Sequence, residues 1–249
     1  MASVHATAIV DPRAEIAGDA IVGPYAIIEA GVVLGPSCVV HAHAVLRGPT
    51  VLGARNVVHP FAVVGGLAQA KRHAGGPGRL VVGDGNVIRE HVTVHGGTGD
   101  TATRIGGDNL LMVGVHVAHD VTIGSHCVLS NAVQLAGHVT VADWVTFGGQ
   151  SGVAQHVRVG ESAFVAAAAA CERDVPPFVV VQGDRARVRA VNVVGLRRRG
   201  VPETSVRALE QAVRKLWLSR TTRVDALQSL AGAEDPFVRA LVASLSHDT

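Results

Sequence analysis

Three residues near the middle of the chain, His116, His119 and Asp120, form the densest group of proton-handling side chains in the sequence. An imidazole titrates close to neutral pH, and a neighbouring carboxylate can orient it and stabilise its cation. Two further histidines, His95 and His138, lie upstream and downstream of this group. These residue types predict a site that moves a proton near neutral pH.

The segments around this group belong to a six-residue repeat. Apolar side chains occupy every sixth position over residues 4–64 and 82–94 and, with a shifted phase, over residues 105–165. A helix has a period of about 3.6 and a strand a period of 2, so neither explains a period of six. Hexads fit a triangular parallel β-helix with one flat face per hexad and three hexads per coil. We predict an all-β solenoid of roughly eight coils, stacked about 4.8 Å apart.

Two polar, glycine-rich segments interrupt the repeat, at residues 65–80 and 95–104. We predict that both leave the coil as loops, which is where a stiff scaffold commonly carries functional residues. The predicted β-helix domain, with these two loops, spans residues 1–190.

The pattern changes after residue 165. Pro176 and Pro177 are incompatible with a regular strand ladder. From Pro202 the apolar residues adopt a helical spacing, and further helices are expected near residue 224 and over 236–245. We predict a C-terminal helical domain over residues 191–249.

Bulk composition restricts the class of protein. The chain has 249 residues, a formal charge of +2 and 17% charged residues, with only 3% aromatic residues and 29 glycines. It contains no apolar run of 18 residues and no N-terminal signal peptide pattern, so we expect a cytoplasmic protein with no integral membrane segment and no nucleic-acid partner. Cys38, Cys127 and Cys171 show no metal-ligand spacing and are expected to be buried thiols.

The repeat also predicts which histidines meet. Three hexads per coil place Val94, Val117, Leu135 and Val153 on one face of successive coils. The polar residues that follow them, and that are expected to line one corner, are His95, His119, His138, Gln155 and His156. Solvated corner histidines without a function are one alternative, and a zinc site is another. No H-x-H or HExxH pattern accompanies the histidines, so no metal is expected.

Five motifs identify a family resemblance. They are IREHVTVHGGT (88–98), GDNLLMVGVHVAHD (107–120), LAGHV (135–139), DVPPF (174–178) and NVVGLRRRG (192–200). With these motifs, the chain resembles the acyl-carrier-protein-dependent UDP-N-acetylglucosamine O-acyltransferases that open lipid A synthesis (the LpxA family), which are left-handed β-helix enzymes built from hexapeptide repeats. The resemblance spans residues 1 to about 245.

The resemblance implies a role for each matching residue. His119 matches the general base, Asp120 its orienting carboxylate, and Gly137 the residue whose amide forms the oxyanion hole. Ala167 matches the residue that limits acyl-chain length. The residues that match substrate-binding positions are Gln69, Arg72, His95, His116, His138, Gln155, Asn192, Arg198 and Arg199.

The resemblance also implies the partners. The acyl donor is the phosphopantetheine thioester of acyl carrier protein, the acceptor is a UDP-amino sugar, and no other cofactor is required. The family assembles as a homotrimer. The basic segment around Arg197–Arg199 suits docking of an acidic carrier protein.

Several acceptor-side positions depart from the family pattern. Ala70 replaces an acidic residue, Arg72 a lysine, Gly96 an arginine and Ala154 a histidine. These changes leave open a related acyltransferase that acts on another acceptor, such as a 3-amino UDP-sugar or a natural-product sugar. A non-catalytic solenoid that binds a partner, and a zinc-dependent solenoid resembling a carbonic anhydrase, are alternatives of other classes.

Overall fold

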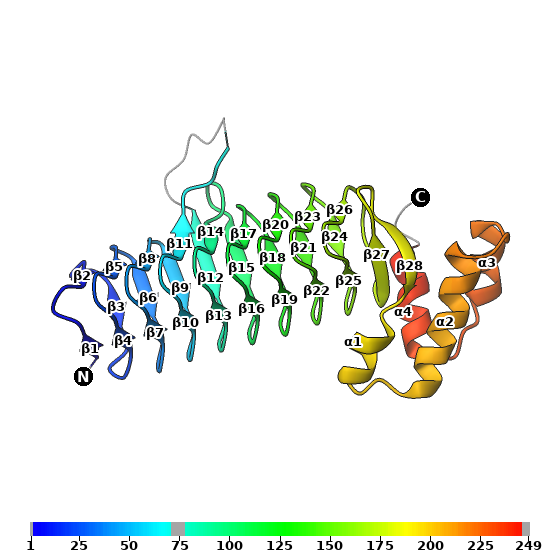
Figure 1. Ribbon diagram of the computed structural model, residues 1–249, viewed down its shortest axis with the longest axis horizontal. Coiled ribbons are helices and arrows are strands. Elements are labelled where there is room, and N and C mark those ends of the chain that lie inside the picture. The colour runs from blue at the N-terminus through cyan, green and yellow to red at the C-terminus, as the bar shows by residue number, and fades with distance from the viewer. Residues whose placement is uncertain (1, 71–77, 246–249) are drawn as a thin grey trace.

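A computed structural model describes residues 2–70 and 78–245 of the chain. It contains three long sheets, which we call the first, second and third sheets and which have 11, 9 and 8 strands. Each coil of the chain adds one short strand to every sheet in turn, so the molecule is an elongated prism with its helices at one end (Figure 1). The prediction of a parallel β-helix of about eight coils is confirmed.

The strands are short, and most contain two residues. The first sheet contains β1 (Ser3–Val4), β4 (Ile21–Val22), β7 (Val39–Val40), β10 (Val57–Val58), β13 (Val87–Ile88), β16 (Leu110–Leu111), β19 (Val128–Leu129), β22 (Thr146–Phe147), β25 (Phe164–Val165), β27 (Val179–Gln182) and β28 (Arg187–Val191). The second sheet contains β2 (Ile9–Val10), β5 (Ile27–Ile28), β8 (Val45–Leu46), β11 (Val63–Gly66), β14 (Thr93–His95), β17 (His116–Val117), β20 (Gln134–Leu135), β23 (Gly152–Val153) and β26 (Ala170–Cys171). The third sheet contains β3 (Glu15–Ile16), β6 (Val32–Leu34), β9 (Thr50–Leu52), β12 (Arg79–Val82), β15 (Ala102–Ile105), β18 (Thr122–Ile123), β21 (Thr140–Val141) and β24 (Arg158–Val159).

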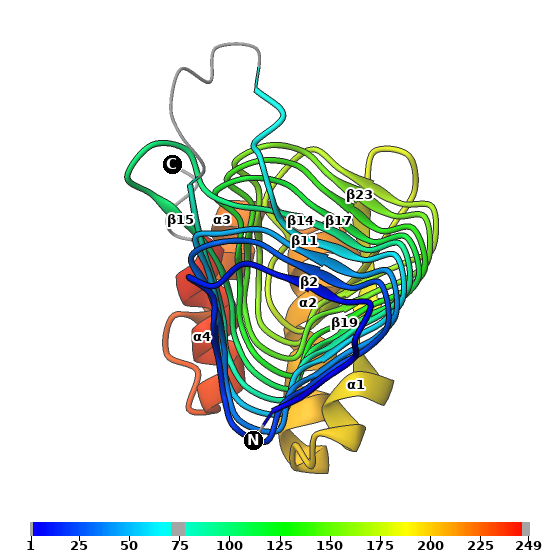
Figure 2. The same ribbon diagram turned by 90° about the vertical axis from the view of Figure 1, so that its left-hand side faces the viewer.

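The repeat sets the register between coils. Val40 of β7 lies opposite Val58 of β10, and the same inward position is buried in almost every coil after the first. A shift of one residue would turn these side chains to solvent, so the pattern determines which residues stack. Seen from the N-terminal end in Figure 2, the chain passes from the first sheet to the second and then the third in a counterclockwise direction as it recedes. The coil is therefore left-handed, as the family resemblance predicted.

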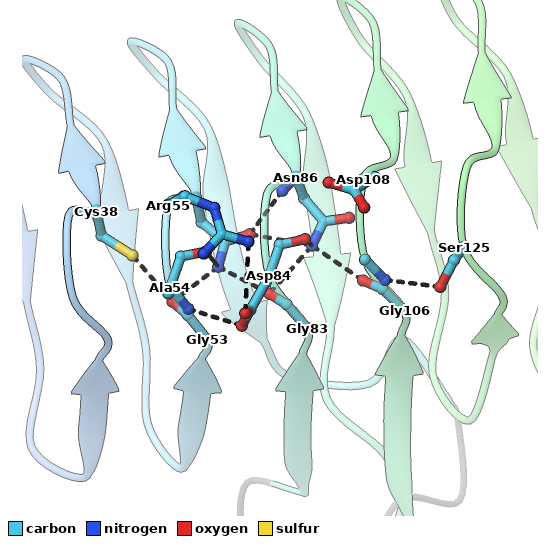
Figure 3. Close-up of polar contacts among 12 residues, drawn as sticks. Cys38, Gly53, Ala54, Arg55, Gly83, Asp84, Asn86, Gly106, Asp108 and Ser125 are labelled. Carbon is cyan, nitrogen blue, oxygen red and sulfur yellow. Dashed lines mark hydrogen bonds and ion pairs between the residues drawn. The ribbon is translucent and has the colours of Figure 1, made fainter.

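The three edges of the prism are the turns between sheets, and the turns from the third sheet to the first carry a buried ladder of asparagines. The amide of Asn86 donates to Asn56 Oδ1 at 3.0 Å and to the Gly106 carbonyl at 2.9 Å, and Asn109 repeats this arrangement one coil further on. We call these turns the asparagine edge (Figure 3). Cys38 and Cys127 cap the ladder, and both are buried free thiols, as predicted.

The two loops are shorter than the sequence predicted. β11 continues to Gly66 and β12 begins at Arg79, while β15 begins at Ala102. The reason is strand pairing, because β12 and β15 lie side by side over a register of four residues that extends to the base of both loops.

The C-terminal region begins with an antiparallel hairpin, β27–β28, which the sequence analysis did not predict. Helices α1 (Val193–Arg198), α2 (Glu203–Trp217), α3 (Arg223–Leu230) and α4 (Pro236–Leu245) follow. The last three were predicted, and α2 buries Val206, Leu209 and Val213 on the expected face. Among the described residues, none of the helices is both long enough and apolar enough to cross a membrane.

Candidate active site

His119 and Asp120 occupy the turn between β17 and β18, where the chain passes from the second sheet to the third. We call these turns the catalytic edge. Asp120 has a φ of 61°, and the corresponding residues of the next two coils, His138 and His156, have φ values of 62° and 65°. The same turn therefore recurs in each coil and projects consecutive side chains from the same edge.

The imidazole of His119 is fixed by Asp120. Its Nδ1 lies 2.8 Å from Asp120 Oδ2, and the two side chains are 10% and 6% exposed. An ionised carboxylate only accepts hydrogen bonds, so Nδ1 carries the proton and Nε2 of the neutral ring has a free lone pair. This is the arrangement that a general base requires.

The carboxylate of Asp120 is held by threonines of the loop between β14 and β15. It accepts hydrogen bonds from the Thr98 amide at 3.0 Å, from Thr98 Oγ1 at 2.8 Å and from Thr101 Oγ1. The Asp120 amide donates to Thr103 Oγ1 at 2.9 Å. Burial alone would raise the pKa of Asp120, but the hydrogen bonds from Thr101, His119 and Thr98 outweigh it and hold the pKa well below its ordinary value.

Gly137 is the residue of the next coil that corresponds to His119. A Cβ at Gly137 would lie 2.7 Å from Cε1 of His119, so the imidazole occupies space that only glycine leaves open. Among the described residues, the amide of Gly137 donates to no acceptor. An unpaired N–H beside this imidazole is suited to stabilising an oxyanion.

The predicted histidine corner is confirmed for His119, His138 and His156, with a difference in register, and is wrong for His95. The rings of His119 and His138 lie 5.2 Å apart at 86°, and His138 stacks on His156 at 4.6 Å. His138 corresponds in register to Asp120 rather than to His119, and its Nε2 lies 3.6 Å from Asp120 Oδ2. The offset follows from the 18-residue coil, which matches Asp120 to His138 and His119 to Gly137, and the sequence analysis did not apply the count at single turn positions.

His95 lies beside His116 instead of in this stack. The two ring centroids are 4.8 Å apart at 77°, and His116 Nδ1 shares a hydrogen bond of 2.8 Å with Thr93 Oγ1. His95 is 7% exposed, and its buried Nδ1 has no partner among the described residues. Burial, together with the nearby His116 and His119, lowers the pKa of His95 to about 4, so the ring is neutral at pH 7. Burial also lowers the pKa of His116.

Gln69 and Gln155 are exposed. Gln155 extends from the catalytic edge one coil beyond Gly137, and Gln69 lies in the loop after β11. Arg72 lies outside the described residues.

The other predicted residues lie on different edges of the prism. Asn192 caps α1 and donates to the Ser162 carbonyl at 2.9 Å, and Arg199 contacts Ser162 and pairs with Glu161 on the asparagine edge. Arg198 is exposed beside it. Ala167 occupies the third edge, between β25 and β26. One chain therefore does not bring these residues to His119.

The sequence analysis missed Thr98, Thr101 and Thr103. Thr98 ends the first quoted motif, so it was visible as a motif residue, but no spacing rule predicts that a loop threonine reaches a carboxylate on the next coil. The same corner could hold a metal ion, because ligand atoms of His119, Asp120 and His138 all lie within 4.8 Å of one another.

Comparisons with known proteins show what the chain is similar to. Residues 174–249 match the family described as UDP N-acetylglucosamine O-acyltransferase, domain 2. The acyl-[acyl-carrier-protein]–UDP-N-acetylglucosamine O-acyltransferase of Burkholderia lata is 45% identical over 250 residues, which cover 97% of this chain and 95% of that protein. The enzyme of the same name from Burkholderia thailandensis is 43% identical over 190 residues, covering 73% of this chain and 72% of that protein.

Solved structures give the same result. The UDP-N-acetylglucosamine O-acyltransferase (LpxA) of Moraxella catarrhalis superimposes with a TM-score of 0.92 at 37% identity, over 98% of this chain and 96% of that one. An LpxA structure from Acinetobacter baumannii has the same TM-score and coverage at 36% identity.

Proposed function

The chain belongs to the acyl-[acyl-carrier-protein]–UDP-N-acetylglucosamine O-acyltransferase family, and from this premise we propose how its residues carry out the reaction. It is an enzyme that transfers an acyl group from acyl carrier protein to UDP-N-acetylglucosamine. The acceptor group is the 3-hydroxyl of the sugar, the acyl group is a 3-hydroxyacyl or other fatty acyl chain, and His119 is the general base.

The reaction needs one base and one oxyanion donor. His119 Nε2 takes the proton of the sugar hydroxyl while the oxygen attacks the thioester carbonyl and forms a C–O bond. The negative charge moves to the carbonyl oxygen, to which the free Gly137 amide donates. Collapse of this intermediate breaks the C–S bond, and the imidazolium returns its proton to the departing thiolate. The products are the 3-O-acyl UDP-sugar and the free thiol of acyl carrier protein. This reaction requires no further cofactor.

Asp120 acts through His119. Its ionised carboxylate keeps the ring proton on Nδ1 and stabilises the imidazolium formed during attack. His95, His116 and His138 surround the base and are suited to positioning the sugar, together with Gln69, Arg72 and Gln155.

A homotrimer would complete the site. The first sheet carries a partly exposed row of apolar outward residues, which are Ile21, Val39, Val57, Val87, Leu110, Val128 and Phe164. The N-terminal half of the second sheet carries a similar row, which consists of Ile9, Ile27, Val45 and Val63. Apolar rows of this length favour contact with another protein surface.

The packing of the protomers in such a trimer determines which of their edges lie side by side. If the first sheet of one protomer packs against the second sheet of the next around a three-fold axis, the asparagine edge of one lies beside the catalytic edge of its neighbour. Arg198, Arg199 and Asn192 of the neighbour would then bind the phosphates of UDP or of the phosphopantetheine arm. Ala167 would lie near the axis, where it limits the acyl chain. Acyl carrier protein would dock on the basic segment that carries these arginines, in the cytoplasm.

The observation that carries this proposal is the buried His119–Asp120 pair beside the unpaired Gly137 amide. The acceptor alternatives are not favoured, because the curated relatives are named for O-acylation of UDP-N-acetylglucosamine. A solenoid that only binds a partner would not need the His119–Asp120 pair.

The test is to incubate the purified protein with a series of acyl carrier protein thioesters and either UDP-N-acetylglucosamine or its 3-amino analogue. Mass spectrometry should detect the 3-O-acyl product with the first acceptor as the preferred one. Preference for the amine would exclude the proposed acceptor. Light scattering should give a trimer, and a 25.7 kDa species alone would contradict the shared site.

A further inference from the structure

The catalytic edge brings together three groups that transition metals bind. Nδ1 of His119 lies 2.8 Å from Asp120 Oδ2, and His138 Nε2 lies 3.6 Å from the same oxygen. Zn²⁺ takes imidazole nitrogen and carboxylate oxygen ligands, and it binds with three protein ligands when a fourth position stays open. The three residues offer this ligand set from two adjacent coils of a rigid prism.

The surroundings favour a divalent cation at this point. Thr98 and Thr101 anchor the carboxylate, so its oxygen does not have to be ordered when the metal binds. His138 is 40% exposed at its side chain, which gives an entry path from solvent.

We propose that His119, Asp120 and His138 form an inhibitory site for Zn²⁺ and similar divalent transition metals. The inhibition rests on the proposed function, in which His119 is the general base. We do not expect Mg²⁺ or Ca²⁺ to bind tightly to this site, because both ions prefer a coordination shell made only of oxygen atoms. Imidazole ligands suit zinc, nickel and copper.

The inhibition follows from the two nitrogens of His119. When Zn²⁺ binds Nδ1, the one ring proton of the neutral imidazole, which Nδ1 shared with Asp120, moves to Nε2, and no proton is lost to solvent. The ring stays neutral, and Nε2 has no lone pair left for the sugar hydroxyl. Coordination through Nε2 would occupy the lone pair directly. Either geometry removes the general base without changing the fold.

The control residue for the test is His126, on the asparagine edge. It resembles His138 in its backbone, with φ values of 60° and 62°, and its Nδ1 also faces a carboxylate, at 3.9 Å from Asp108 Oδ2. Among the described residues, no second histidine joins His126 and Asp108 to form a set of three ligands. Asparagine tolerates positive φ, so His138→Asn and His126→Asn test the ligand at equal backbone cost.

The experiment titrates chelator-treated protein with Zn²⁺ by calorimetry and with Co²⁺ by visible absorption, before any substrate is added. Turnover is then measured over the same zinc range, and a chelator is added at the end. We expect one metal per protomer, d–d bands of a nitrogen- and oxygen-ligated cobalt ion, and inhibition by micromolar zinc that the chelator reverses. His138→Asn should weaken metal binding by about tenfold or more, and His126→Asn should bind as the wild type does.

Three results would overturn the proposal. The first is an absence of zinc binding to the wild type, and the second is equal binding by His138→Asn. The third is full turnover while zinc occupies the site. Failure of the proposed function is separate, because it appears as an absence of acyl transfer in zinc-free buffer, and the metal titrations do not depend on activity.

Discussion

The asparagine edge and the catalytic edge are built from turns of the same kind, but their polar groups differ. Those of the asparagine edge are hydrogen-bonded to one another, whereas some of those at the catalytic edge have no partner among the described residues. At the asparagine edge, Asn56, Asn86 and Asn109 repeat one arrangement from coil to coil, and each side chain both donates and accepts within the ladder. Figure 3 shows Asn86 between its neighbours. At the catalytic edge the repeat is broken, and the Gly137 amide and His95 Nδ1 are left without partners among the described residues.

The difference shows how a repetitive fold carries chemistry. Buried polar groups that satisfy one another stabilise the coil and have no capacity left for a ligand. Groups that remain unpaired cost stability and are available to a substrate. We therefore expect substitutions at the asparagine edge to act on stability, and substitutions at the catalytic edge to act on turnover.

The largest expected effect is that of His119→Ala. Loss of a general base typically costs about 10²–10⁴-fold in rate, so kcat should fall by that factor. The midpoint of thermal unfolding should stay close to that of the wild type, because the ring contributes little to the aliphatic core. Comparable turnover by the folded variant would remove His119 from the mechanism.

Asn86→Ala should give the opposite result. It leaves the Asn109 amide and the Gly106 carbonyl without their partners, which should lower the free energy of unfolding by about 3 kcal/mol. Turnover per folded molecule should be unchanged. The control is Gln134→Ala, an exposed polar residue, for which we expect about 0.5 kcal/mol or less. Denaturant unfolding checks both, and equal effects would mean that the ladder adds no stability.

His95 should contribute to the pH dependence of the free energy of unfolding. Its pKa is 6.5 in the unfolded chain and about 4 when folded, so between these values the unfolded chain binds the extra proton. Stability therefore rises with pH across this window and is lost as the pH falls from 6.5 to 4, by at most about 3 kcal/mol. His95→Gln should lack this component. Urea unfolding at pH 7 and pH 4.5 measures it, and parallel losses in both proteins would contradict the assignment.

The smallest expected effect is that of Thr98→Val. It removes one hydrogen bond to Asp120 and keeps the shape and the backbone amide, so kcat should fall by about fivefold to tenfold with little change in KM. Thr98→Ser keeps the hydroxyl and should retain most of the activity. A change confined to KM would instead place Thr98 in substrate binding.

Much of the fold could be predicted because the six-residue repeat is visible in the sequence and determines how each coil stacks on the next. Aliphatic residues at every sixth position can be buried together only if each stacks on its counterpart one coil away, as Val117 stacks on Leu135. The same count predicted that His119, His138 and His156 would share an edge. The β27–β28 hairpin and α1 were missed because they follow the point where the repeat stops.

The sequence by itself determined the parallel coil, its inward residues and the adjacent His119–Asp120 pair, since these depend on spacing along the chain. Only the tertiary structure decided that Thr98 and Thr101 hold Asp120, that Gly137 makes room for the imidazole, and that Asn192 and Arg199 lie on another edge. The physical reason is that these contacts depend on the path of loops and on the packing of one turn against the next. The path of a loop has no repeating pattern, and the 18-residue coil shows which turn positions are neighbours but not which side chains touch.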